Sequence, residues 1–259
     1  MRRGRWVVIW GLVWLGVGCE GRVERLRGVG QVVVVVTEDW NGVTGRMGRY
    51  QREGGGWRRV GREVPVVVGR TGLGWAGETI RAGWGGGRGP IKREGDGRSP
   101  AGLFRLGTAF GEGAARGERR WRIPFWETTG SLVCVDDPRS SRYNRLVDTS
   151  SLGSEPVDWS SAEQMRREDE QYQLGIVVEQ NRSPVRPGEG SCIFLHLWEG
   201  PDQGTIGCTA MDRQSLTELL NWLDKARTPH LLQLPRAELE RLQRRGQLPP
   251  QLLSLHGKG

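Results

Sequence analysis

Histidine and cysteine are scarce in this chain, which has three histidines and four cysteines among its 259 residues. The glycine-rich segment Gly95–Ser99 has neither the spacing nor the lysine of a phosphate-binding loop, which argues against a nucleotide site of that type. The first half of the chain lacks the three-to-four spacing of a long amphipathic helix, and no internal repeat or long linker is visible. These absences predict a single domain that is mainly β.

Positive charge is abundant, with a formal net charge of +8. The basic residues are scattered through glycine-rich stretches instead of lining one helix or alternating with exposed aromatics. This pattern predicts no nucleic-acid partner. A basic surface would also suit an anionic polymer of the cell wall.

The N-terminus has the pattern of an export signal. Arg2, Arg3 and Arg5 precede an apolar run, Trp6–Val17, that is too short to span a membrane. Cys19 follows a segment that resembles the lipobox of lipoproteins, although Gly16 stands where that pattern has a branched aliphatic residue. We therefore expect an exported protein of the bacterial periplasm or cell envelope. A lipid anchor through Cys19 and simple cleavage both stay open.

Three cysteines remain once Cys19 is set aside, an odd number in a compartment that oxidises thiols. Cys134 and Cys192 lie in the apolar runs 132–135 and 192–197. We predict a disulfide between them, which leaves Cys208 free. Two buried thiols are the alternative.

Several segments have the pattern of strands. The β-branched run at 32–36 predicts a buried strand, and 46–52 with 57–62 predicts a hairpin across three glycines. Further strands are expected at 64–68, 132–135, 174–178 and 192–197.

Three segments have helical signals. Cap-type serines predict a helix from Ser160 to about Tyr172. Asp212 is placed to cap a helix whose leucines recur along one face, and another helix is expected at 236–244, after Pro235.

A nucleophile and a base are close together in the sequence. His196 lies in the apolar run 192–197, and Cys208 follows Gly207 just before the predicted helix. A cysteine attacks acyl groups as its thiolate, which a neighbouring imidazole stabilises. Backbone N–H groups around Gly207, Cys208 and Thr209 are candidate donors to an oxyanion. A backbone carbonyl is the candidate to orient the histidine, because no Asp or Asn is marked out for that role.

The alternatives for these residues are less favoured. His230 and His256 are expected at the surface of the C-terminal region. A zinc site of Cys192, His196 and Cys208 is disfavoured, because on one strand the first two would lie about 13 Å apart. We predict no metal site.

Two motifs give the chain its resemblance to a known family. Thr205, Gly207 and Cys208 after an upstream histidine, together with Lys92 and the segment 94–104, resemble the signatures of the L,D-transpeptidase catalytic domain. With Asp158-Trp159 and 161–165, the resemblance spans roughly 32–223. It implies a β-sandwich with a few flanking and C-terminal helices, and no cofactor.

The resemblance also implies an activity. Members crosslink peptidoglycan, so Cys208 would be the nucleophile and His196 the base in an acyl exchange on stem tetrapeptides that releases D-alanine. Gly207, Thr209 and Thr205 would shape the oxyanion site, and Trp198 and Ile206 would line the substrate cleft.

The resemblance completes the predicted domain organisation. Residues 1–19 are a signal peptide, 20–31 a short N-terminal segment, 32–227 the catalytic domain and 228–259 a C-terminal helical extension. The sequence leaves the oligomeric state undetermined.

Three departures from the family pattern keep other functions open. Ile206 replaces the histidine usually found two residues before the cysteine, and Ala210 stands where many members have arginine. The loop between His196 and Cys208 is also short. A divergent, non-catalytic cell-wall-binding protein and an L,D-carboxypeptidase are therefore the alternatives.

Overall fold

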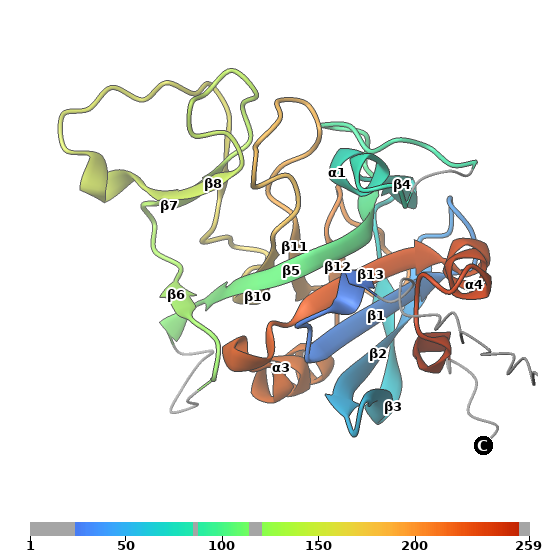
Figure 1. The fold of residues 1–259 in the computed structure, drawn as a ribbon. Helices are drawn as coiled ribbons and strands as arrows, with labels where there is room; N and C mark the ends of the chain where they lie inside the picture. The colour runs from blue at the N-terminus through green and yellow to red at the C-terminus, as the bar shows by residue number, and fades with distance from the viewer. Residues whose placement is uncertain (1–23, 85–87, 114–120, 254–259) are drawn as a thin grey trace, which may run out of the picture.

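A computed structural model describes residues 24–84, 88–113 and 121–253 (Figure 1). The expected signal peptide and Cys19 lie outside these ranges. The helices are α1 (Gly77–Arg81), α3 (Arg213–Trp222), α4 (Arg236–Arg244) and the 3-10 turns η1 (Glu24–Leu26), η2 (Thr149–Leu152), η3 (Lys225–Arg227) and η4 (Pro250–Leu253). The strands are β1 (Gln31–Thr37), β2 (Thr44–Glu53), β3 (Gly56–Val67), β4 (Leu73–Trp75), β5 (Ser99–Gly111), β6 (Phe125–Glu127), β7 (Leu132–Val135), β8 (Arg145–Asp148), β9 (Ala162–Gln164), β10 (Leu174–Val178), β11 (Phe194–Leu197), β12 (Thr209–Met211) and β13 (His230–Pro235).

The main sheet closes on itself. Its strands follow the order β10-β11-β12-β3-β2-β1-β13-β5-β4, and β10 also pairs with β5. The larger of two hydrophobic clusters combines apolar side chains of this sheet with leucines of α3 and α4. The predicted mainly β, sandwich-like fold is confirmed.

Strand β1 lies near the centre of this sheet, parallel to β13 and antiparallel to β2. Its valines 32–36 are all buried, which explains why the run has β-branched residues at consecutive positions instead of an alternating pattern. The predicted hairpin forms as β2 and β3. The segment 64–68, predicted as a separate strand, instead continues β3 as far as Val67.

The C-terminal segment 228–259 contributes more than the predicted helical extension. It begins with β13, which pairs with β1 on one side and with β5 on the other. His230, expected at the surface, is the first residue of this strand and is partly buried. His256 lies outside the described residues. The main sheet therefore depends on residues that follow the predicted domain boundary.

A second, three-stranded sheet with the order β8-β7-β9 lies beside the main sheet (yellow-green in Figure 1). The predicted Cys134–Cys192 disulfide is present and joins β7 to the segment before β11. The predicted strand at 192–197 begins only at Phe194, because Cys192 has a φ of 53° and donates its N–H to the Asn144 side chain.

The predicted helix at 160–172 is wrong. Residues 162–164 form β9, which pairs with β7. Ser160 donates its N–H and its hydroxyl to the Asp137 carboxylate, so it holds a loop instead of capping a helix.

The two C-terminal helices form as predicted. Asp212 caps α3 by accepting the N–H of Ser215, and the leucines of this helix pack toward β10 and β11. Helix α4 follows Pro235 and packs on β13 and β1. Among the described residues, no helix is long and apolar enough to cross a membrane.

Candidate active site

Cys208 and His196 line the same cleft, which has a volume of about 310 Å³. Its lining includes Ile193, which belongs to the larger hydrophobic cluster of the protein. Cys208 belongs to the smaller cluster, together with Phe194, Tyr172 and the disulfide cysteines. The side chains of Cys208 and His196 are 7% and 3% exposed, so both reach the cleft from an otherwise buried position.

The pairing of two strands brings the predicted nucleophile and the predicted base to the same face. Strands β11 and β12 are parallel, with Leu195 opposite Thr209 and His196 opposite Ala210. Cys208 directly precedes β12, which places it beside Phe194, two residues before His196. Because side chains alternate along a strand, Cys208 and His196 point the same way.

The sulfur of Cys208 is held by backbone groups. The N–H of Phe194 donates to Sγ at 3.3 Å, and the thiol donates to the carbonyl of Cys192 at 3.4 Å. Cys208 is the only free cysteine among the described residues. The disulfide at Cys192 therefore helps position the carbonyl that the thiol contacts.

His196 is oriented by a backbone carbonyl, as expected for a site without an acidic partner. Its Nδ1 lies 2.8 Å from the carbonyl oxygen of Leu197. Since a carbonyl only accepts, Nδ1 carries the proton and Nε2 keeps a lone pair. The edge-to-face contact with Tyr172, at 5.1 Å between ring centroids, also fixes the plane of the imidazole.

Burial makes both reactive groups neutral at ordinary pH. Loss of solvent raises the pKa of Cys208 to about 12, although the N–H of Phe194 and the charge of Lys92 lower it in part. Burial lowers the pKa of His196 to about 4. The resting state is therefore a thiol beside a neutral imidazole, which is the protonation state a general base requires.

A tight turn positions Cys208. The hydroxyl of Thr205 donates to the Cys208 carbonyl at 2.5 Å and accepts the N–H of Gly207 at 3.1 Å. From the start of β5, the buried Ser99 hydroxyl donates to the same carbonyl at 2.7 Å. A side chain on Gly207 would meet the Arg98 carbonyl at 3.3 Å, so glycine relieves a close approach.

Not all of the predicted site residues line the cleft. Thr205, Ile206 and Gly207 do, and Ile206 is 70% exposed. Thr209 instead turns its hydroxyl into the core, where it donates to Gln233 at 2.6 Å. Trp198 is absent from the cleft wall, and its backbone N–H donates to the Met211 carbonyl.

The sequence interpretation missed the acidic and aromatic wall of the cleft. Tyr172 and Glu163 line it, and the tyrosine hydroxyl donates to Glu163 at 2.7 Å. Burial raises the pKa of Glu163. Both residues fall in the wrongly predicted helix, where no local pattern indicates that the chain returns to the cleft.

Lys92, part of one of the two motifs, also lines the cleft. Its buried ammonium group pairs with Asp96 at 2.7 Å and donates to the Arg93 carbonyl. Lys92 therefore brings a positive charge close to Gly207.

No described group of three His, Cys, Asp or Glu side chains is arranged to hold a metal ion. Cys192 is part of the disulfide, which removes it from the zinc site considered above.

Comparison with known proteins identifies a family. Residues 32–232 match the model of YkuD, the L,D-transpeptidase catalytic domain. No match was found among curated proteins.

Two solved structures are similar in part. One is "Structure of Bdellovibrio bacteriovorus Bd1075", with 13% identity and a TM-score of 0.39 over 86% of this chain and 57% of that chain. The other is the helical cell shape determining protein Pgp2 from Campylobacter jejuni, with 14% identity and a TM-score of 0.36 over 80% of this chain and 50% of that one. The chain thus spans little more than half the length of these proteins.

Proposed function

This chain belongs to the L,D-transpeptidase catalytic-domain family, and on that premise we propose that it is a cysteine acyltransferase acting on the stem tetrapeptides of peptidoglycan. The observation that carries the proposal is the cleft shared by the free thiol of Cys208 and by His196, whose Nε2 is left as an acceptor. Both belong to the motifs through which the sequence resembles the family.

In the proposed reaction, Sγ of Cys208 attacks the carbonyl of the third stem residue as its proton passes to Nε2 of His196. The new S–C bond forms, the C–N bond to D-alanine breaks, and the imidazolium returns the proton to the leaving amine. An amine of another stem then attacks the thioester with His196 again as base, which regenerates the thiol. With water as acceptor, the same intermediate gives carboxypeptidase activity.

The developing oxyanion needs donors at the turn before β12. Because the N–H of Gly207 is already donated to Thr205, the N–H of Cys208 is the better candidate. Thr205 and Ser99 hold the Cys208 carbonyl, so we assign them the role of positioning this turn.

Export to the cell envelope and a lipid anchor through Cys19 belong to the same proposal. Both rest on the first nineteen residues, and both are consistent with a peptidoglycan substrate.

The direct test is analysis of the fragments released from purified sacculi after incubation with the wild-type protein, with Cys208→Ala or with His196→Gln. We expect new crosslinked dimers and free D-alanine from the wild-type protein only. Free D-alanine without dimers would assign water as the acceptor. Identical profiles from all three proteins would refute the proposed activity.

A non-catalytic protein that binds the cell wall is the second candidate. The exposed Ile206 at the cleft gives an apolar contact surface in place of the usual histidine, and the burial-raised pKa of Cys208 disfavours the thiolate. Cosedimentation with sacculi that is equally strong for the wild-type protein and for Cys208→Ala, without any new fragment, would favour this function.

A further inference from the structure

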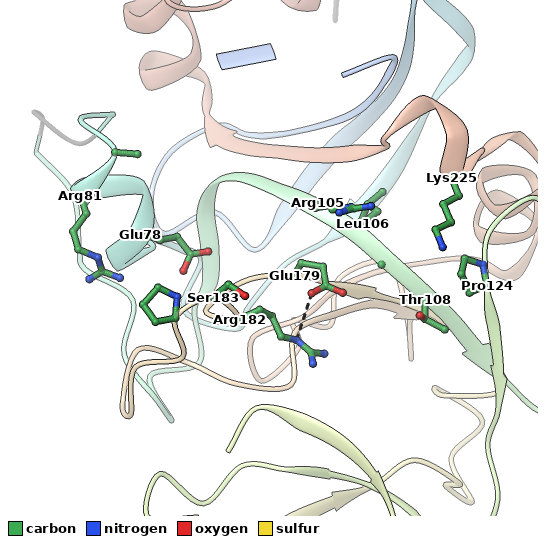
Figure 2. Close-up of a pocket in the computed structure, with 13 residues that line it drawn as sticks. Glu78, Arg81, Arg105, Leu106, Thr108, Pro124, Glu179, Arg182, Ser183 and Lys225 are labelled. Carbon is green, nitrogen blue, oxygen red and sulfur yellow. Dashed lines mark ion pairs between the residues drawn. The ribbon is translucent and has the colours of Figure 1, made fainter. Parts of the chain in front are cut away.

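A second cavity, of about 810 Å³, lies apart from the residues of the catalytic cleft (Figure 2). Its walls are the middle of β5, helix α1, the segment 179–184 after β10, Pro124 and Lys225. None of these residues lines the cleft of Cys208. Its volume is within the range of sites for small ligands.

Positive charge predominates in the walls of this cavity. Four basic side chains line it against two acidic ones, Glu78 and Glu179. In the view of Figure 2, Arg81 lies at one end and Lys225 at the other, with Arg105 and Arg182 between them. The cations are therefore spread along the cavity instead of converging on one point.

The two carboxylates are engaged by protein groups. Glu78 accepts the backbone N–H of Asn181, at 2.9 Å to one of its oxygens. Glu179 lies against Gly107, where any Cβ would come within 2.2 Å of its Oε1. Glycine at this position of β5 thus leaves room for the carboxylate, which faces Arg182 at 3.8 Å.

The basic residues, by contrast, have unused donors. Within the described part of the chain, neither Arg105 nor Lys225 makes a side-chain hydrogen bond or an ion pair. The Nε of Arg182 is buried without a hydrogen-bond partner, although the side chain is 21% exposed. Arg81, at the end of the cavity, is already paired with Glu189 at 2.7 Å. Arg105 and Lys225 are exposed and line the cavity, so their charges are available to a ligand there.

We propose that this cavity is a second binding site, and that it takes a ligand with two spaced carboxylates, held by Arg105 and Lys225 near one end and by Arg182 at the centre. Guanidinium groups match carboxylates in geometry, and such charge-assisted hydrogen bonds are among the stronger ones. A compact anion would fill only a small part of the volume and would reach only some of the cations. A free polycarboxylate and an acidic peptide share the required chemistry.

The site does not depend on the proposed enzymatic activity. The segment between β10 and β11 does connect the two cavities, since Glu179–Pro184 line one and Ser191–Ile193 line the other. Occupation of the second site is thus in a position to influence the segment that holds Cys192.

The test is calorimetric titration, at low ionic strength, of the full chain with three probes: citrate, the peptide acetyl-Ala-Glu-Ala-Glu and inorganic phosphate. The test variant is the double substitution Arg105→Gln with Lys225→Gln. The matched control is Arg27→Gln with Arg62→Gln, which removes the same charge from exposed residues that do not line the cavity. All four side chains are exposed, so both variants are expected to fold.

We expect citrate, the peptide or both to bind the wild-type protein and the control. We expect the test variant to bind at least about tenfold more weakly, since two charged donors are lost. The probe that binds identifies the source of the carboxylates. The proposal would be overturned by binding to neither carboxylate probe, by equal affinity in the test variant, by an equal loss in the control, or by phosphate binding as tightly as the carboxylates.

Discussion

At the scale of single residues, the site combines a buried thiol with a buried neutral imidazole. Burial raises the pKa of Cys208 and lowers that of His196, so each shift opposes a resting thiolate–imidazolium pair. The acceptor Nε2 and the carbonyl contact at Nδ1 nevertheless prepare His196 to receive a proton during attack. We therefore expect the proton to pass from Sγ to Nε2 during attack on the substrate and not before it.

The raised pKa of Cys208 predicts how alkylation depends on pH. The thiolate is the reacting form, so below a pKa of about 12 its fraction rises about tenfold per pH unit. The rate of iodoacetamide labelling at Cys208, followed by peptide mass spectrometry, should therefore climb without a plateau from pH 7 to pH 9. A rate that is already level at pH 7 would mean that the resting enzyme holds a thiolate.

The lowered pKa of His196 predicts a loss of stability in acid. Between the ordinary pKa of 6.5 and the folded-state value of about 4, the unfolded chain binds a proton that the native chain does not. The unfolding free energy should fall as the pH drops through this window, by about 2–3 kcal/mol for this group.

Urea unfolding at pH 7 and at pH 4.5 measures this effect, with His196→Gln as the comparison. The glutamine variant should lose less stability over the same interval, because its side chain does not titrate. Equal losses in the two proteins would argue against a buried neutral histidine.

At the scale of elements, local sequence signals predicted those parts whose partners are near in the chain. The valine run of β1, the hairpin of β2 and β3, and the Asp212 cap of α3 each have a local cause. Contacts between distant segments account for the elements that were predicted wrongly. Ser160 binds Asp137, twenty-three residues away, and so cannot cap a helix.

In the candidate site, too, local signals predicted only the residues that are close together in the chain. The motif around Cys208 indicated the thiol and the histidine that line one cleft, whereas Tyr172 and Glu163 reach this cleft only through the pairing of β9 with β7 and the segment that follows. The side chain of Thr209 alternates into the core of the sheet, where Gln233 accepts its hydroxyl, so only the backbone of this residue stays a candidate for the oxyanion site.

The disulfide joins the small sheet to the segment beside Cys208, so its removal should destabilise the protein at both places. It closes a loop with a sequence separation of 58 residues. The double variant Cys134→Ala with Cys192→Ala should lose about 2–4 kcal/mol of unfolding free energy. Thermal and urea unfolding measure the change, and Cys208→Ala, which leaves the bridge intact, is the control. Unfolding curves that match those of the wild-type protein would show that packing alone holds the two sheets together.

At the scale of the whole molecule, closure of the main sheet depends on the C-terminal segment. Strand β13 lies between β1 and β5, so without it the closed sheet would be open between these two strands. The boundary predicted after residue 227 thus falls inside the folded unit. The prediction missed the short apolar strand because the helical pattern of 236–244 follows it directly.

A chain that ends at residue 227 should therefore fail to fold. Leu231, Leu232 and Leu234 are almost completely buried, and their loss would expose both neighbouring strands. Dispersion of amide signals in an NMR spectrum measures folding, with the full chain as reference. A native-like spectrum from the shortened chain would contradict the central position of β13.

The central claim is that Cys208 carries the acyl group while His196 moves the proton. It is tested most directly by the intact mass of the protein after brief mixing with a synthetic stem tetrapeptide. We expect a covalent adduct of the tripeptide acyl group, mapped to Cys208, with D-alanine released in equal amount. The adduct should be absent from Cys208→Ala and should form far more slowly in His196→Gln. Turnover of the tetrapeptide by Cys208→Ala at the wild-type rate would contradict the claim.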